Sequence, residues 1–246
     1  MSKTCYIPVR GLDDVIASKV TGWNKYLVAN LRGLYQEKTG NPLNLSTISS
    51  DTRMNVYAGT NENASLSNFS IRPFTVTNTG DDPDGPIAGH FNTVEGAFQA
   101  QKLFYANLDE ESKAAILASL EKATGAQAKA IGRRISNLDT KEWDKVSSSL
   151  MENLITESFK QNPEEAAKLL ETGKATLTHT QDKGKWGEEF PRILMSVREK
   201  LGGSVTIDEA VKTLVEFRRN LNKEDAKRIL DAVNNPSVSY IQLRED

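Results

Sequence analysis

The spacing of apolar residues along the chain predicts a protein built mainly of helices. Between residues 12 and 38, apolar side chains recur at steps of three and four, which is the repeat of one helix face. They are Ile16, Val20, Trp23, Leu27, Leu31 and Leu34. We therefore expect one long amphipathic helix, ended by Gly40 and Pro42. The same pattern predicts further helices at about 93–106, 109–121, 126–135, 140–160 and 191–201.

Residues that begin and end helices place the remaining ones. Pro163 followed by two glutamates is typical of a helix start, and Gly173 is typical of a helix end. Beyond the glycine pair at 202–203, Thr206 has the spacing of a capping box with the glutamate three residues later. Asn222 is positioned to cap a last helix.

Strand signals are few and short. The candidates are 54–58, 71–77 and 175–179. The glycine, proline and aspartate run at 78–86 predicts an exposed loop, and the polar segment 181–189, which holds Trp186, is expected to be a loop as well. Because helices dominate and the strands do not alternate with them regularly, the predicted fold class is α+β, predominantly helical, with few short strands.

Composition and charge exclude several classes of protein. Hydrophobic residues make up 38% and charged residues 26%, which is usual for a globular chain. Acidic side chains number 33 and basic ones 31, so the basic footprint of a bulk nucleic-acid binder is missing. The single cysteine, Cys5, and the lack of an apolar N-terminal run predict a cytoplasmic protein, and no stretch approaches the ~20 apolar residues of a membrane helix. No metal-ligand spacing and no cofactor motif occurs, so we expect neither a metal nor a cofactor.

The segment 91–102 holds the most informative polar residues. Successive helix residues turn by about 100°, so Glu95, Gln99 and Lys102 fall on one stripe, while Phe98 is expected to point elsewhere. One interpretation is a solvated, salt-bridged helix face. The other is a site in which Glu95 is a general acid or base. Lys102 would then tune the pKa of Glu95 or act as an amine nucleophile.

Combined with the rest of the chain, this segment resembles the signature helix of the NADAR (YbiA-like) family of N-glycosidases. The matching elements stand in the family's order. They include Asn55-Val56-Tyr57, Ser67-Asn68-Phe69, Thr93-Val94-Glu95 with Phe98-Gln99-Ala100-Gln101-Lys102, Gly132-Arg133, Trp143, Met151, Phe159, Asn162-Pro163, Leu169-Leu170-Glu171-Thr172-Gly173, Trp186-Gly187 and Leu194-Met195-Ser196-Val197-Arg198-Glu199. The resemblance implies a YbiA-like N-glycosidase domain at 54–202, between an N-terminal helical extension at 1–53 and a C-terminal helical extension at 203–246.

The resemblance also implies an activity, the hydrolysis of an N-glycosidic bond in a phosphorylated ribose compound. Substrates proposed for the family include riboflavin-pathway intermediates and ADP-ribose attached to guanine. The expected partner is therefore a nucleotide-like small molecule or ADP-ribosylated guanine in nucleic acid, with no membrane involved. The family's functional glutamate corresponds to Glu95 and its tryptophans to Trp143 and Trp186. Its signature lysine corresponds to Lys102, for which the guanine branch implies a Schiff base.

The residue types suit this chemistry. Cleavage of a C1′–N bond develops oxocarbenium character on the ribose, which a carboxylate can stabilise. Aromatic rings stack on bases, although Trp143 also fits a pure core position, and Trp186 in a polar loop is the stronger contact candidate. Arg133 or its neighbour Arg134 is either a phosphate ligand or a simple surface charge. The remaining candidate substrate contacts are Gln99, Asn68, Phe69, Asp182 and Glu188.

Two departures from the family pattern bear on the substrate. The family's Asp-x-x-Trp-Gly run is lengthened here, so that Asp182 lies one residue further from Trp186 and Lys183 takes the expected place. An asparagine that serves the riboflavin branch aligns with Glu188. The leading hypothesis is therefore an N-glycosidase of an ADP-ribose-linked or nucleotide-like substrate. The alternatives are a riboflavin-intermediate N-glycosidase, a non-catalytic NAD or ADP-ribose-binding module, and an interaction protein whose extensions bind a partner or a second copy.

Overall fold

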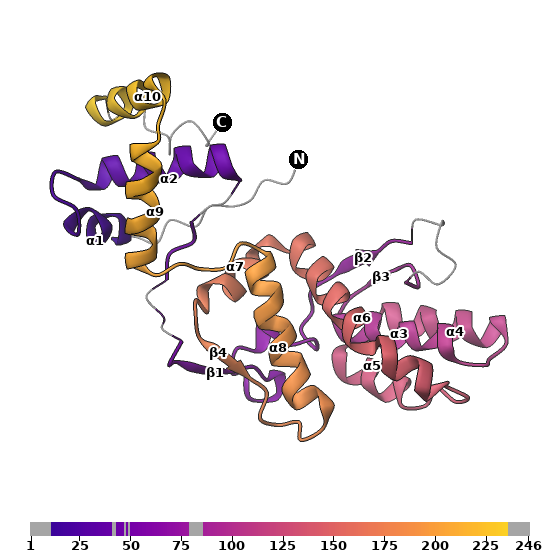
Figure 1. Cartoon of the computed structure of the whole chain (residues 1–246). Coiled ribbons are helices and arrows are strands. Elements are labelled where there is room, and N and C mark those ends of the chain that lie inside the picture. Colours follow the sequence, from indigo (N-terminus) through magenta and orange to yellow (C-terminus); the bar gives the residue numbers. More distant parts are fainter. Residues whose placement is uncertain (1–10, 41–42, 47, 49, 79–85, 236–246) are drawn as a thin grey trace. The chain divides into compact units, whose positions relative to one another are not determined.

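The computed structural model describes residues 11–40, 43–46, 48, 50–78 and 86–235, which form two compact units (Figure 1). The larger unit comprises Arg53–Leu169 and Thr176–Leu201. The smaller one comprises the described residues within Met1–Thr52, Leu170–Ala175 and Gly202–Asp246. Within the described part of the chain, no helix is both long and apolar enough to cross a membrane.

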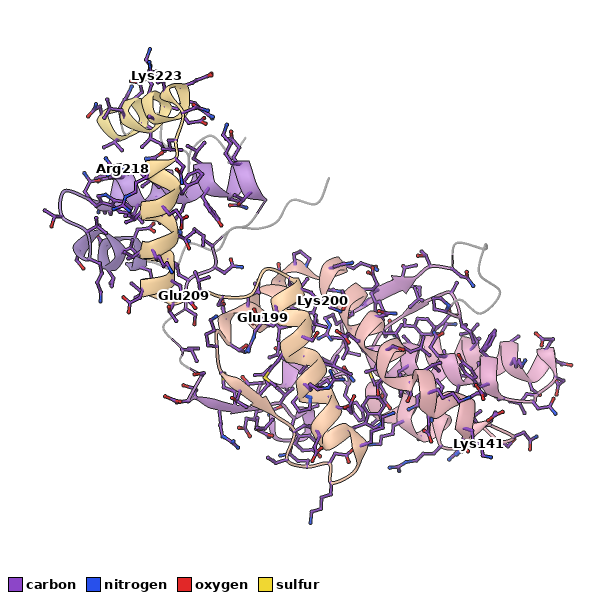
Figure 2. All side chains as sticks on the ribbon, viewed as in Figure 1. Lys141, Glu199, Lys200, Glu209, Arg218 and Lys223 are labelled. Carbon is purple, nitrogen blue, oxygen red and sulfur yellow. The ribbon has the colours of Figure 1, made fainter. Side chains whose placement is uncertain are left out.

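Helices make up most of the larger unit. They are α3 (Val94–Gln101), α4 (Glu110–Glu121), α5 (Gly125–Gly132), α6 (Thr140–Gln161), α7 (Pro163–Glu171, which continues into the smaller unit) and α8 (Lys185–Lys200). Three short 3-10 helices accompany them, at η1 (Ala58–Thr60), η2 (Ala64–Leu66) and η3 (Lys102–Tyr105). Lys200, labelled in Figure 2 at the end of α8, lies 2.7 Å from Glu152 on α6 and joins these two neighbouring helices.

The strands of the larger unit form two separate pairs. Strand β1 (Arg53–Asn55) pairs in parallel with β4 (Thr176–Thr178), and β2 (Phe74–Val76) pairs antiparallel with β3 (Gly89–Phe91). Two-stranded sheets among many helices confirm the predicted fold class, α+β and predominantly helical. Strand β3 was not predicted, because its sequence has no apolar alternation and its extended form depends on pairing with β2.

Helix α3 packs against α4, α5 and α6 within the larger unit (Figure 1). It begins as predicted, with the Thr93 side chain accepting a hydrogen bond from the Gly96 amide at 3.0 Å. All eight of its residues are buried. The interpretation of its polar stripe as a solvated face is therefore wrong. The helix is also shorter than the predicted 93–106, since the chain tightens into η3 after Gln101.

The smaller unit contains the described N-terminal and C-terminal helices, packed on a core of their own. These are α1 (Leu12–Ser18), α2 (Lys25–Thr39), α9 (Ile207–Arg219) and α10 (Lys223–Asn234). The capping box at Thr206 and the cap at Asn222 are both present, as predicted. Arg218, labelled on α9 in Figure 2, has its guanidinium carbon 5.6 Å from the centre of the Trp23 ring.

The prediction of one long helix at 12–38 is wrong. The chain breaks between α1 and α2, where Gly22 has a positive φ of 81° and Asn24 caps α2 by accepting from the Leu27 amide at 2.9 Å. The apolar repeat continues across the break because both helices pack on the same core. Gly40 ends α2 as predicted, with a φ of 73°. Pro42 lies outside the described residues.

Two predicted loops have different outcomes. Most of the loop predicted at 78–86, namely residues 79–85, lies outside the described residues. The loop predicted at 181–189 ends early, because α8 begins at Lys185 and carries Trp186 in its first turn. Pro191 lies in the second turn of α8, where its ring removes the hydrogen bond to the carbonyl four residues earlier and crowds that carbonyl. Polar residues before it form the exposed side of that turn.

Candidate active site

A cavity of about 560 Å³ lies within the larger unit. The segment that follows β1, helices α3, α5 and α6, and the connection from β4 into α8 contribute its walls. Its lining residues are Tyr57, Ala58, Gly59, Ser67, Asn68, Phe69, Glu95, Phe98, Gln99, Lys102, Lys129, Arg133, Trp143, Met151, His179, Asp182, Trp186 and Phe190.

The structure brings the candidate residues together around this cavity, with two exceptions, Glu188 and Arg134. Those that line it are Asn68, Phe69, Glu95, Gln99, Lys102, Arg133, Trp143, Asp182 and Trp186. Glu188 does not, because it lies on the exposed side of the first turn of α8. Arg134 is exposed and is likewise absent from the wall.

Glu95 is the buried carboxylate of the cavity wall. It lies in the first turn of α3, where the positive end of the helix dipole favours an acid, and only 7% of the residue is exposed. Gln99, one turn later, donates an amide hydrogen to Glu95 Oε1 at 2.8 Å. Burial raises the pKa of Glu95, against the hydrogen bond from Gln99 and the positive charges of Lys129, Lys102 and Arg133. Its environment therefore favours the protonated acid more than an ordinary glutamate's does.

Lys102 is a half-buried ammonium close to that carboxyl. It follows α3 at the start of η3, and its Nζ lies 5.8 Å from the centre of the Trp143 ring. Burial lowers the pKa of Lys102, while the charge of Glu95 acts in the opposite direction. The amine is thus nearer to its neutral, nucleophilic form than a surface lysine is.

Three aromatic rings make a continuous wall. Phe98 lies between the two tryptophans, with its ring centre 5.0 Å from that of Trp143 and 5.3 Å from that of Trp186. The expectation that Phe98 points away from the polar stripe is wrong. Phe98 comes three residues after Glu95, and three rotations of about 100° around the helix axis bring it back to within about 60° of Glu95, beside the stripe. Trp143 is 7% exposed, so one side chain serves both the core and the cavity wall.

Three residues of the cavity wall were not predicted from the sequence: Tyr57, Lys129 and His179. Lys129 stands one turn before Arg133, so the pairing of the two cations follows from helix spacing alone. Its Nζ lies 5.7 Å from the centre of the Phe69 ring. His179 follows strand β4 directly, and this place after a strand was the available signal in the sequence. Among the described residues, no group of three or more histidine, cysteine, aspartate or glutamate side chains is arranged to hold a metal ion.

Amide groups complete the polar lining. The Asn68 side chain points its nitrogen at the Met151 sulfur, 3.2 Å away, and its buried Oδ1 has no hydrogen-bond partner among the described residues. A buried acceptor left without a donor is costly, and a sugar hydroxyl would satisfy it. The Gln99 side chain packs directly against Gly132. A Cβ added to that glycine would lie 1.9 Å from Gln99 Oε1, so only glycine leaves room for this orientation of Gln99.

Asp182 reaches the cavity despite the extra residue before Trp186. Its side chain accepts a hydrogen bond from the Gly184 amide at 2.7 Å, which closes a tight turn. Its carbonyl packs so closely on Gly187 that a Cβ there would lie 2.1 Å from the oxygen. The turn therefore absorbs the added residue and leaves both Asp182 and Trp186 in the cavity wall.

A family model and several curated proteins match this chain in sequence. The model of the NADAR domain matches residues 56–202. The chain is 29% identical over 160 residues to N-glycosidase YbiA of Escherichia coli K12, a match that covers 61% of this chain and 89% of that protein. N-glycosidase YbiA of Shigella flexneri gives the same values. The NMR structure of E. coli YbiA is 27% identical, with a TM-score of 0.49 over 65% of this chain and 92% of that one.

Proposed function

The chain belongs to the NADAR domain family, and we propose that it hydrolyses the C1′–N ribosyl bond of an ADP-ribose-linked or nucleotide-like substrate, such as ADP-ribosylated guanine. The curated relatives that match it over most of their length are N-glycosidases, which are hydrolases that cleave N-glycosyl bonds. The one observation that carries the proposal is the buried carboxyl of Glu95, held by Gln99 in a cavity with an aromatic wall.

Glu95 supplies the acid–base chemistry. When the C1′–N bond breaks, positive charge develops on the ribose ring and the electron pair of the bond goes to the departing nitrogen. A carboxyl whose pKa is raised by burial can give a proton to that nitrogen, and its carboxylate form can stabilise the cation. Proton transfer of this kind contributes roughly 10²–10⁴-fold to rate.

The walls suit a nucleotide. Phe98 and the two tryptophans offer flat apolar surfaces on which a base can stack, worth roughly 1–3 kcal/mol per base in nucleic-acid binders. Lys129 and Arg133 stand one turn apart at an exposed part of the wall. Together they can bind the two phosphates of an ADP-ribose group, the arginine through paired hydrogen bonds.

Lys102 has two roles open to it in this reaction. As an ammonium it holds down the pKa of Glu95 and stabilises negative charge on a departing base. As a neutral amine it can attack the aldehyde of an opened ribose ring and form a Schiff base. Borohydride reduction during turnover distinguishes the two, since only the second leaves a covalent ribose adduct on Lys102, seen by mass spectrometry and absent from Lys102→Arg.

The test of the proposed function is release of the base from defined substrates. The purified protein is incubated with ADP-ribosylated guanosine, with a single-stranded oligonucleotide that carries ADP-ribosylated guanine, and with riboflavin-pathway intermediates, and products are separated by chromatography. We expect release from an ADP-ribosylated guanine and loss of at least about 100-fold in Glu95→Gln. Glu188→Gln is the matched control, because that glutamate is exposed and outside the cavity wall.

Each outcome has a defined meaning. Release that survives Glu95→Gln unchanged contradicts the role of that residue. Release only from riboflavin-pathway intermediates replaces the substrate proposed here, even though the asparagine of that branch is replaced by the outward-facing Glu188. Calorimetric binding of ADP-ribose without release from any of these substrates identifies a non-catalytic binding module instead.

A further inference from the structure

We propose that His179 is the second proton-transfer residue of the cavity, accepting a proton from the attacking water through its ring Nε2. This inference rests on the proposed N-glycosidase reaction and divides its acid–base work between two residues. In that division, Glu95 gives a proton to the departing nitrogen and His179 activates the water.

The hydrogen bonding of His179 determines which ring nitrogen is free. Nδ1 lies 2.8 Å from the backbone carbonyl oxygen of Val56. A carbonyl oxygen can only accept, so Nδ1 carries the hydrogen of that bond. In the neutral ring, the other nitrogen, Nε2, then has a lone pair and can accept a proton. Nε2 makes no hydrogen bond with any residue in the described part of the chain.

The backbone around His179 holds this arrangement in place. Strand β1 leads into Val56, whose amide donates to the Thr178 carbonyl at 2.9 Å while its own carbonyl accepts from the next residue, His179. The amide and the carbonyl of Val56 are thus both hydrogen-bonded to residues at the end of β4. A base whose orientation is set by a backbone hydrogen bond needs little reorganisation during the reaction.

Packing on the ring supports the same role. The Tyr57 ring centre is 6.0 Å from that of His179, and the Phe190 ring meets it edge-on at 5.3 Å. All three side chains line the cavity. On α8, the helix that carries Phe190, Lys185 donates to Ser147 Oγ and Glu189 pairs with Arg192. His179 thus lines the cavity, and its acceptor nitrogen has no hydrogen-bond partner among the described residues.

Hydrolysis of a C1′–N bond needs two proton transfers. A C1′–O bond forms from water, and the C1′–N bond breaks with its electron pair on the nitrogen. Water must lose one proton, which passes to His179 Nε2. The departing nitrogen gains one proton, which comes from the Glu95 carboxyl. Solvent then returns the extra proton from His179 to Glu95, so that one water is consumed and both residues regain their starting forms.

The test compares His179→Asn with a histidine outside the site. Asparagine keeps an N–H for the Val56 carbonyl but has no proton-accepting nitrogen. His90→Asn is the matched control, because His90 is exposed on β3 and lies 3.1 Å from Thr75 Oγ1 instead of in the cavity. With ADP-ribosylated guanosine as substrate, we expect His179→Asn to lower kcat roughly 10²–10⁴-fold with little change in KM, and His90→Asn to act like the native protein.

Azide provides the readout that a purely structural role would not move. As an anion it attacks C1′ without losing a proton, so added azide should restore turnover in His179→Asn and yield a ribosyl azide. It should not restore Glu95→Gln, in which protonation of the departing nitrogen is what has been lost. His179→Gln, which keeps an amide near the Nε2 position, serves as a second variant if His179→Asn has a lowered unfolding temperature.

The results separate this inference from the proposed function. If the native protein releases no base from ADP-ribosylated guanosine, the proposed function for that substrate fails. If the native protein is active and both His179 variants keep kcat within about twofold, the inference about His179 is wrong. Loss of kcat in folded variants that azide does not restore also overturns it, because the imidazole would then have some other role than activating water.

Discussion

Replacing Gly132 with alanine should disable the cavity without touching its chemistry directly. Gly132 is the last residue of α5, where that helix passes over α3. An alanine Cβ at this position would lie 1.9 Å from Gln99 Oε1 and 2.3 Å from Gln99 Cδ, far inside the 3.4–4 Å of ordinary contact. The Gln99 side chain therefore has to rotate, and its 2.8 Å hydrogen bond to Glu95 is lost.

The magnitude follows from that hydrogen bond. Hydrogen bonds to charged groups contribute about 1.5–3 kcal/mol. If the reaction needs Glu95 in its present orientation, kcat/KM should fall by about 10- to 150-fold, since each 1.36 kcal/mol is a factor of ten in rate. Losing the Gln99 hydrogen bond also raises the pKa of Glu95 further, because that bond favours the carboxylate. Thermal stability should change little, because the greater helix propensity of alanine, up to about 1 kcal/mol, offsets part of the loss.

A double-mutant cycle provides the assay. Base release is measured for Gly132→Ala, for Gln99→Ala and for the two combined. If Gly132→Ala acts only by displacing Gln99, the double variant should be no slower than Gln99→Ala alone. Effects that multiply in the double variant, or a Gly132→Ala protein with native kcat/KM, would refute the reasoning.

Two further predictions concern stability. Glu95→Gln should raise the unfolding temperature at neutral pH. The folded protein binds a proton at Glu95 more tightly than the unfolded chain does, so the stability of the native protein falls as pH rises through the raised pKa of Glu95. Glutamine does not titrate, so the variant avoids this loss of stability. Equal unfolding temperatures of both proteins across pH 5 to 8 would contradict this prediction. A fragment of residues 54–202, the predicted enzyme domain, should unfold at a lower temperature than the full chain. The reason is that Leu170 loses its hydrogen-bond partner Ser204 and Lys174 loses its ion-pair partner Glu209. Calorimetry of both proteins measures the two unfolding midpoints, and equal midpoints would disprove the prediction.

Local signals in the sequence determined most of the helices. Helix α6 was predicted within one residue at each end, because its apolar face is regular. The structure adds a local cap, since Asp139 accepts hydrogen bonds from the amides of Lys141 and Glu142. Capping and periodicity act over three or four residues, so they are legible in the chain itself. The stripe of Glu95 and Lys102 on one helix face was legible for the same reason, and the resemblance to the NADAR family singled it out.

Only the tertiary structure decided the chemical environment of that stripe. Burial of α3 by α4, α5 and α6 turns an ordinary-looking charged face into one in which the pKa of Glu95 is raised and that of Lys102 is lowered. The cavity joins residues far apart in the chain, since the bond between Val56 and His179 spans 123 positions. The folded chain also places Glu188 on the exposed side of α8. Sequence patterns report neighbours along the chain, whereas burial and electrostatics depend on neighbours in space, and these exist only after the chain has folded.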